Sequence, residues 1–271
     1  DKIYWGNGWM WDDDPSTDFP YMTPLTINDN AITVVVETAK SGALTVSTIP
    51  PTKYVTITNS AAVSSNGENT LSITRNYQED KDEIVISGKI PAGKSARRTV
   101  NIRFPEKYFL TMLQEQLELN GIRITGELKT TDALNYSPTD TIYTNTVALD
   151  SIIVNLNKTS DNLSTEMLLR ALAVHAAGEP ASADNGIQLI DSLITLAGYN
   201  PLNYRIVDGS GVSHYNLISA ELIRGLLEYL YINYKDTRQF EVFKNSQPIA
   251  GKDGSLKNRM KNSAAEGKVF A

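Results

Sequence analysis

The stretch Lys158-Thr159-Ser160-Asp161-Asn162-Leu163-Ser164-Thr165-Glu166-Met167-Leu168-Leu169-Arg170 decides how this chain is interpreted. Polar residues open it, and an apolar pattern at helical spacing follows, which predicts a helix with one face in a core. The apolar positions are Leu163, Met167, Ala171 and Leu172. Residues 160–162 fall at or just before the first turn, where unpaired backbone N–H groups suit a polar site. Serine, aspartate and asparagine are also frequent helix N-caps, so a purely structural role stays open.

The composition is that of an ordinary globular protein. Of the 271 residues, 41% are hydrophobic and 21% are charged, and no apolar run approaches the roughly 18 residues of a membrane-spanning helix. The net charge is -6 and Lys and Arg are scattered, which argues against a nucleic-acid partner. The chain has no cysteine and two histidines, His175 and His214, which excludes thiolate chemistry and a site of three or four histidine ligands.

The first 30 residues are rich in Trp, Asp and Pro, which predicts a structured loop rather than a helix or strand. The run Asp12-Asp13-Asp14 in this loop could bind an ammonium group or a cation, or could form a solvated turn before Pro15. The calcium-loop pattern and its glycine are not matched, so the sequence gives no specific reason to expect a metal.

Residues 31–103 change to runs of Thr, Val and Ile with short polar interruptions, which predicts a small all-β module. Its expected strands are 31–37, 43–49, 54–58, 70–77, 83–90 and 99–104. The module carries no side chains at catalytic spacing, so we expect it to serve as a scaffold or to contact a partner.

A helix is predicted from Pro105 to Asn120, where Gly121 ends it, and strands are predicted at 122–128 and 141–147. After Leu149 the pattern is helical, with helices expected at 150–157, 162–177, 183–197 and 220–234. A short strand at 205–207 leads into the turn-rich loop 208–213. A glycine-punctuated loop covers 249–256, and 267–271 is expected to begin a further strand.

Ser160-Asp161-Asn162 has the form of the S-x-N element that penicillin-binding proteins and class A β-lactamases combine with an S-x-x-K nucleophile and a K-T-G strand. Four further stretches, together with Ser160-Asp161-Asn162, occur in the order found in one subfamily of these proteins. They are Trp9-Met10-Trp11-Asp12-Asp13, Asp208-Gly209-Ser210-Gly211, Ala250-Gly251-Lys252-Asp253-Gly254-Ser255-Leu256 and Glu266-Gly267-Lys268-Val269. The chain resembles the low-molecular-mass class C penicillin-binding proteins, the penicillin-binding protein 4 type D-alanyl-D-alanine carboxypeptidase/endopeptidases, although the β-rich part before Arg103 matches only in kind.

The resemblance implies an α+β multidomain fold. Residues 148–271 would be the helical part of a penicillin-binding, β-lactamase/transpeptidase-like domain. Residues 1–30 and 104–147 would form an inserted α/β subdomain, and 31–103 a nested all-β module. The long segment ahead of Ser160 distinguishes this chain from class A β-lactamases, which place their nucleophile motif much nearer to S-D-N.

The resemblance also implies a reaction. The family's serine D-alanyl-D-alanine carboxypeptidase/endopeptidases act on peptidoglycan peptides through an acyl-enzyme and bind β-lactams, without a cofactor or metal. Ser160 would be the proton-relay serine and Asn162 the ligand of the substrate amide. The implied location is the periplasm or another extracytoplasmic part of the bacterial envelope.

Other positions carry over as substrate contacts. Asp12 and Asp13 resemble the acidic part of the inserted domain that faces the amine of the substrate's side chain. Val212 and Ser213 resemble the wall of the pocket for that side chain. Asp208 is expected to form a turn, and Lys158 to be solvated or structural. His175 is expected to lie in packing or at the surface, while His214 remains a candidate substrate contact.

The family's other two motifs are expected to be absent from the chain. No serine stands three residues before a lysine, and no Lys-Thr-Gly occurs. We therefore expect S-x-x-K to lie before Asp1 and K-[ST]-G after Ala271, so that these residues are an internal piece that is inactive alone. The alternative is a non-catalytic cell-wall binding or scaffold protein that keeps the fold without the nucleophile. A β-rich adhesin would not explain the second half.

Overall fold

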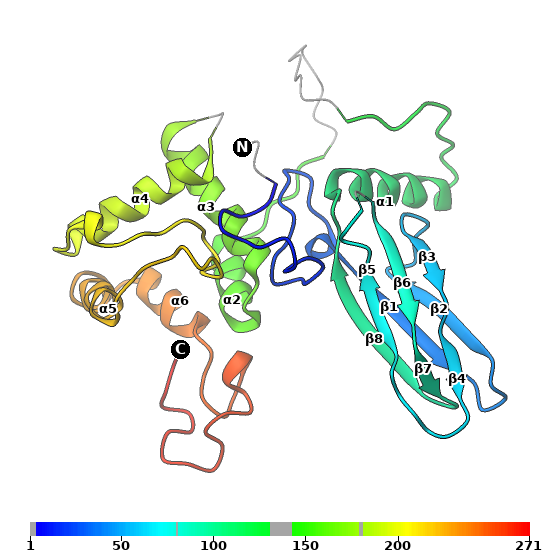
Figure 1. The fold of residues 1–271 in the computed structure, drawn as a ribbon. Coiled ribbons are helices and arrows are strands. Elements are labelled where there is room, and N and C mark those ends of the chain that lie inside the picture. The colour runs from blue at the N-terminus through cyan, green and yellow to red at the C-terminus, as the bar shows by residue number, and fades with distance from the viewer. Residues whose placement is uncertain (1–3, 80, 131–142, 179–180) are drawn as a thin grey trace. The chain divides into compact units, whose positions relative to one another are not determined.

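The computed structural model describes residues 4–79, 81–130, 143–178 and 181–271. These residues divide into two compact units (Figure 1). The β-rich unit comprises residues 4–5 and the described part of 9–135, and the helical unit comprises residues 6–8 and the described part of 136–271.

One sheet of the β-rich unit has β1 (Ala31–Thr38) between β2 (Leu44–Ile49) and β8 (Ser95–Asn101), with both neighbours antiparallel to it. Val34 lies opposite Thr48 on one side and opposite Arg98 on the other. The near-continuous apolar run of β1 fits its central position in the sheet. Most of its side chains are buried, both those on one face of the sheet and those on the other.

The second sheet has β6 (Glu83–Ser87) at its centre. β3 (Thr56–Asn59) pairs parallel to β6, and β5 (Ser72–Arg75) pairs antiparallel to it. A further parallel pair joins β4 (Ala62–Ser64) to β7 (Lys89–Pro91). In β6, the buried residues Ile84 and Ile86 alternate with half-buried residues. This is the pattern of a strand with one face in a core.

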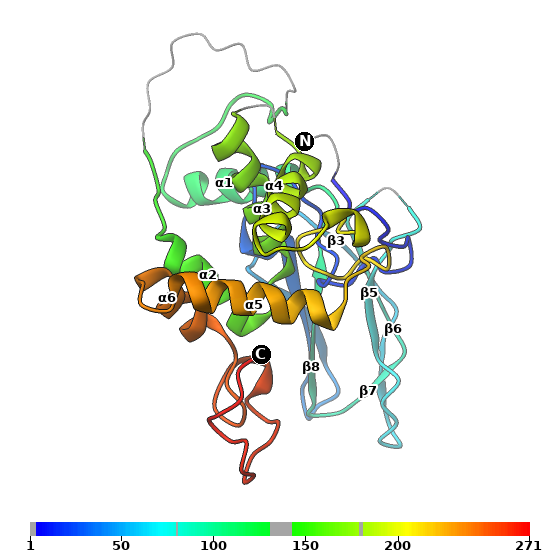
Figure 2. The ribbon, with the colours of Figure 1, turned by 90° about the vertical axis from the view of Figure 1, so that its left-hand side faces the viewer.

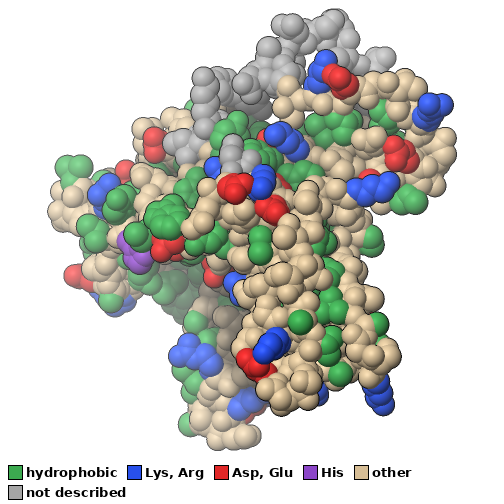
Figure 3. Space-filling model, turned by 45° about the vertical axis from the view of Figure 1, so that its right-hand side comes forward, with side chains coloured by type: hydrophobic (Ala, Val, Ile, Leu, Met, Phe, Trp, Pro, Cys, Tyr) green, Lys and Arg blue, Asp and Glu red, His purple; other side chains and the backbone are tan. Residues whose placement is uncertain are grey.

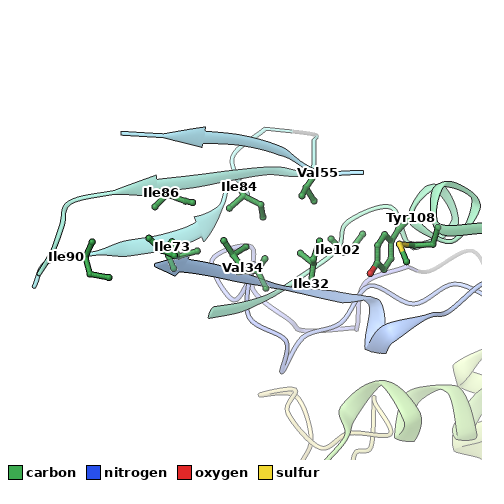
Figure 4. Packing of buried hydrophobic residues seen from close by; sticks show 12 residues of the cluster. Ile32, Val34, Val55, Ile73, Ile84, Ile86, Ile90, Ile102 and Tyr108 are labelled. Atoms are coloured by element: carbon green, nitrogen blue, oxygen red, sulfur yellow. The ribbon is translucent and has the colours of Figure 1, made fainter. Parts of the chain in front are cut away.

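Figure 4 shows the core of the β-rich unit, where alternate side chains of β1, β5 and β6 meet. Ile84, Ile86 and Val34 are fully buried there. Tyr108 and Met112 of α1 (Pro105–Leu119) belong to the same core. Helix α1 and the strands therefore share one core. The aromatic ring of Tyr108 and the thioether of Met112 add apolar contacts to this core.

Arg75 is the most buried charged residue of this unit, with 0% of its surface exposed. It lies on the inner face of β5, two residues after Ile73, and forms an ion pair with Asp14. Its Nε atom is 3.7 Å from Asp82, and its Nη2 atom donates to the side-chain oxygen of Asn101 at 3.1 Å. The guanidinium thus joins the N-terminal loop to β5 and β8.

Neighbouring groups extend this network. The Tyr21 hydroxyl donates to the second carboxylate oxygen of Asp14 at 3.0 Å, and burial followed by the Asp14 charge raises the pKa of Tyr21 to about 12. The backbone N–H of Arg103 donates to Asp82 at 2.9 Å. The predicted irregular loop of residues 1–30 is therefore confirmed for its described part, apart from a short 3-10 turn at Asn28–Asn30, and buried charges hold it in place.

The helical unit contains α2 (Leu149–Thr159), α3 (Asn162–Ala177), α4 (Ala183–Leu196), α5 (Ala220–Tyr234) and α6 (Arg238–Ser246). Helix α3 packs against α4, and α2 packs against α6 (Figure 2). The four predicted helices are confirmed to within two residues at each end. Helix α6 was not predicted, although Thr237 caps it by accepting a hydrogen bond from the Phe240 N–H at 3.3 Å.

The strand predictions are wrong in several places. Residues 122–128 and 143–147 form no strand, while 141–142 lie outside the described residues. The predicted strand 83–90 is split into β6 and β7, and β4 was missed. Residues 205–207 and 267–271 contribute single bridges, Arg205 to Leu217 and Ile249 to Phe270. Alternating apolar residues form a strand only where a partner strand satisfies the backbone.

Basic and acidic side chains are interspersed on the face of the molecule shown in Figure 3. Among the helices in the described ranges, none combines the length and apolar character needed to cross a bilayer.

Replacing Arg75 with Met should destabilise the β-rich unit by about 3–5 kcal/mol, because Asp14 and Asp82 would stay buried without their counter-charge. Urea unfolding followed by circular dichroism measures this change. Lys89→Met is the matched control, since the pair of Lys89 with Glu68 at 3.0 Å is exposed and its loss should leave the unfolding midpoint nearly unchanged. Equal midpoints for both variants would contradict a structural role for the Arg75 network.

Candidate active site

The S-D-N stretch forms the tight turn between α2 and α3. Ser160 ends α2 in the left-handed conformation, with φ 60° and ψ 54°, and the Asp161 N–H donates back to the Leu156 carbonyl at 2.9 Å. Asp161 is the N-cap of α3, because its carboxylate accepts from the Ser164 N–H at 3.1 Å and from the Ser164 hydroxyl at 2.5 Å. The N-cap prediction is therefore confirmed, and Asp161 is the capping residue.

Ser160 and Asn162 flank this cap. Ser160 is exposed, and within the described ranges its hydroxyl makes no hydrogen bond. A serine in the left-handed region is uncommon and costs free energy that glycine would avoid. Such local strain is frequent at functional positions. Asn162 is half-buried at the first position of α3, beside the positive end of the helix.

The buried face of α3 differs from the predicted one. Leu163 is buried as expected, but Ala171 and Leu172 are exposed. The remaining buried positions are Glu166, Leu169 and Ala173. A charged residue thus occupies the middle of the buried face, which a search for apolar periodicity misses. The one sequence feature that could have drawn attention to Glu166 is the i, i+4 spacing of Glu166 and Arg170, which allows an ion pair.

The carboxylate of Glu166 binds the loop that contains Asp208-Gly209-Ser210-Gly211. Its Oε1 atom accepts from the Gly209 N–H at 2.9 Å, the Ser210 N–H at 2.9 Å and the Ser210 hydroxyl at 2.7 Å. Its Oε2 atom accepts from Arg170 at 3.1 Å. Gly209 lies so close to α3 that a Cβ there would be 3.0 Å from the Thr165 carbonyl oxygen. This loop and the S-D-N turn are therefore both attached to α3.

Asp208 shapes the loop from inside. Its carboxylate accepts from the Gly211 N–H at 2.9 Å, the Ser213 N–H at 2.8 Å and the Asn216 side chain at 2.6 Å. Asp208 therefore forms the turn, as predicted. Ser213 is buried and its hydroxyl donates to the Asn7 carbonyl at 2.7 Å, whereas Val212 is half-buried. Their assignment to a pocket wall stays a prediction.

Lys158 is structural. Its ammonium group donates to both carboxylate oxygens of Asp253, at 2.9 and 2.8 Å, and to the Gln247 carbonyl at 2.6 Å. The hydrogen bond from Lys158 holds the pKa of Asp253 below its usual value. Gly254 approaches the same turn, since a Cβ there would be 2.9 Å from the Lys158 carbonyl oxygen. The loop 249–256 is thus fixed to the residues just before Ser160.

The last two stretches that carried the resemblance lie side by side. The Ala250 N–H donates to the Val269 carbonyl at 2.9 Å, and the Gly267 N–H donates to the Ala250 carbonyl at 2.8 Å. Lys252 pairs with Glu266 at 2.9 Å, and this contact lowers the pKa of Glu266. Through Lys158 and Asp253, both stretches are connected to the S-D-N turn.

The three acidic residues of the N-terminal loop differ in environment. Asp14 is buried against Arg75, and Asp13 is half-buried and accepts from the Met10 N–H at 2.8 Å. Asp12 is exposed and makes no hydrogen bond or ion pair within the described part of the chain. All three belong to the β-rich unit, so the role predicted for Asp12 and Asp13 rests on the resemblance. The described residues contain no group of three or more His, Asp or Glu that could hold a metal ion.

The two histidines of the chain, His175 and His214, are both exposed. The form Lys-Ser-Gly of the K-[ST]-G motif does occur, at Lys40-Ser41-Gly42, so the expectation that these letters are absent from the chain is wrong. These residues form the exposed turn between β1 and β2 in the β-rich unit. They also precede S-D-N in the chain, whereas the family's K-[ST]-G follows it.

The fold resembles that of solved penicillin-binding proteins. The crystal structure of penicillin binding protein 4 (dacB) from Haemophilus influenzae aligns with a TM-score of 0.76 and 21% identity, over 100% of this chain and 60% of that one. The same protein complexed with a novel β-lactam aligns with a TM-score of 0.67 and 20% identity, over 91% of this chain and 57% of that one. The α+β multidomain fold class is confirmed, while the predicted boundaries of the domains stay a prediction.

The sequence identifies the family. Residues 1–271 match the D-Ala-D-Ala carboxypeptidase 3 (S13) family, and the chain belongs to it. A D-alanyl-D-alanine carboxypeptidase of Actinomadura sp. (strain R39) is 28% identical over 80% of this chain and 41% of its own length. Penicillin-sensitive carboxypeptidase A of Dictyostelium discoideum is 26% identical over 98% of this chain and 52% of its own. The chain thus spans about half the length of the curated relatives it matches.

Replacing Ser160 with Gly should stabilise the helical unit by about 0.5–1 kcal/mol, because glycine removes the cost of the left-handed conformation but adds entropy to the unfolded chain. Ser160→Ala is the matched control, since it removes the hydroxyl and keeps the Cβ atom. Urea unfolding should give a higher midpoint for the glycine variant than for the alanine variant. If the two midpoints coincide, the turn at Ser160 carries no conformational cost.

Proposed function

We propose that the protein containing this chain is a serine D-alanyl-D-alanine carboxypeptidase/endopeptidase of peptidoglycan that also reacts with β-lactams. The observation that carries the proposal is the family match over residues 1–271, together with the S-D-N element at an exposed, left-handed turn at the start of α3. Membership in the family supports the reaction, and the turn supports the assignment of the residues.

The reaction proceeds through an acyl-enzyme. A nucleophilic serine bonds to the carbonyl carbon of the penultimate D-alanine, the peptide C–N bond breaks, and the leaving amine takes up a proton. Water then hydrolyses the ester and frees the serine. A β-lactam follows the first half of this sequence, with its ring C–N bond as the bond that breaks. The chain has no serine three residues before a lysine, so these 271 residues supply the second motif and not the nucleophile.

Ser160 and Asn162 have distinct roles in this scheme. The exposed Ser160 hydroxyl both accepts and donates a proton, as a relay to the leaving amine requires. The Asn162 side chain binds the amide of the peptide next to the reacting carbonyl, which orients the substrate. Fixed polar groups of this kind lower the barrier because they need no rearrangement when charge develops.

The resemblance to the family supports two sets of substrate contacts. Val212 and Ser213 would line a pocket for the side chain of the peptide, and the carboxylates of Asp12 and Asp13 would bind its amine. Peptides of this class lie outside the cytoplasmic membrane, so we place the protein in the extracytoplasmic envelope, in the periplasm where an outer membrane is present.

A non-catalytic scaffold with the same fold is the rival function. The protein expressed at its full encoded length and treated with a fluorescent penicillin distinguishes the two. Covalent labelling supports the peptidase, whereas reversible binding to peptidoglycan without labelling supports the scaffold.

Asn162→Ala in that full-length protein should lower the rate of acylation by about 100-fold, because a preorganised polar contact to the substrate is lost. The rate is measured from the time course of labelling by the fluorescent penicillin. Asn233→Ala is the matched control, because the Asn233 side chain is exposed and donates only to the Tyr229 carbonyl of its own helix. An unchanged rate for Asn162→Ala would remove this residue from the site.

A further inference from the structure

We infer that Glu166 is a positioning residue that fixes the loop 208–213 to the helix that begins at Asn162. The inference rests on the proposed function, because it concerns the pocket wall on this loop and the S-D-N turn on this helix. Glu166 touches neither the reacting atoms nor the substrate in this scheme. It sets the distance between two groups of residues that would.

The contacts of Glu166 are unusual for a helix residue. Only 1% of its surface is exposed, and three donors from two consecutive loop residues converge on one carboxylate oxygen. Hydrogen bonds to an ionised acceptor are stronger than neutral ones. Arg170, one helical turn later, binds the other oxygen and balances the charge. One carboxylate oxygen therefore holds the loop, and the other is paired with Arg170 of the same helix.

The loop obtains no support from regular secondary structure. Residues 208–213 form no helix or strand, so their backbone N–H groups obtain no partners from a regular ladder. Without Glu166, the N–H groups of Gly209 and Ser210 would lose their acceptor in a half-buried position. Asp208 orders the turn internally, and the contacts with Glu166 join the turn to α3.

The geometry of α3 explains why the connection affects the site. Glu166 follows Asn162 by four residues, which is about one turn of the helix, so the two side chains belong to one rigid segment. Val212 and Ser213 follow Ser210 directly in the loop. Fixing Ser210 to Glu166 therefore fixes the pocket wall relative to Ser160 and Asn162. A buried carboxylate is a costly way to gain stability alone, because apolar residues often pack there at least as well.

The test uses the full-length protein with Glu166→Ala, Glu166→Gln and Ser210→Ala. The first readout is hydrogen exchange of the amides of Gly209 and Ser210, which does not depend on catalysis. Exchange should be at least about tenfold faster in Glu166→Ala, because these amides lose their acceptor. Glu166→Gln keeps an acceptor oxygen and should show an intermediate effect. Ser210→Ala removes one donor of three and covers the case in which Glu166→Ala does not fold.

The second readout is acylation by the fluorescent penicillin. Glu166→Ala should slow acylation by about 10- to 100-fold through misplacement of the pocket wall, and Glu166→Gln should recover part of the rate. Glu228→Ala is the matched control, since Arg224 and Glu228 form an i, i+4 pair of the same kind on the exposed surface of α5. This control should leave both readouts unchanged.

The outcomes separate the two proposals. Unchanged exchange at Gly209 and Ser210 in Glu166→Ala would overturn the inference, as would acylation within about twofold of a wild-type protein that is labelled. A wild-type protein that reacts with no penicillin would contradict the proposed function, and the exchange data would still decide whether Glu166 anchors the loop.

Discussion

The hydrogen bonds between the Glu166 carboxylate and the N–H groups of Gly209 and Ser210 determine how the helical unit presents its motifs. Helix α3 carries the S-D-N turn at its start and this carboxylate one turn later. Because the loop 208–213 has no regular structure of its own, its position depends on a side chain from elsewhere. Lys158 does the same for the loop 249–256 from the other side of the turn.

The β-rich unit uses the same principle with the opposite charge. Arg75 points inward from β5 and binds Asp14 of the irregular N-terminal segment. In both units, a buried ionic side chain on a regular element binds an irregular segment of the chain. Buried charges of this kind stabilise little on balance, but they fix a single arrangement. We take this as the physical reason for charged residues inside two small cores.

The sequence predicted the helices well and the strands poorly, for a physical reason. The ends of α3 are encoded locally, by the Asp161 cap and by Gly178 with φ 79°. A strand depends on a partner far away in the chain. Residues 122–128 alternate apolar and polar residues, but no strand pairs with them, and Ile122 is 53% exposed. Strand β1 was predicted to within one residue, because a run buried on both faces is a stronger signal.

The candidate site was predicted from motifs, and its supporting residues were not. Ser160 and Asn162 stand out because of their spacing, whereas the apolar periodicity of the helix does not single out Glu166. Only the structure shows that the apolar face turns to include it. Lys40-Ser41-Gly42 shows the converse error, because three letters of a motif have no chemical meaning in an exposed turn that precedes S-D-N. Motifs identify candidates, and contacts assign their roles.

The central claim is that these 271 residues supply the S-x-N part of a penicillin-reactive site, while the nucleophile is elsewhere in the protein. Peptide mapping by mass spectrometry, after reaction of the full-length protein with benzylpenicillin, tests it most directly. The account predicts one penicilloyl adduct, on a serine that stands three residues before a lysine and outside these residues, with Ser160 unmodified. An adduct on Ser160 or on any other residue of this chain, or the absence of any adduct, would contradict it.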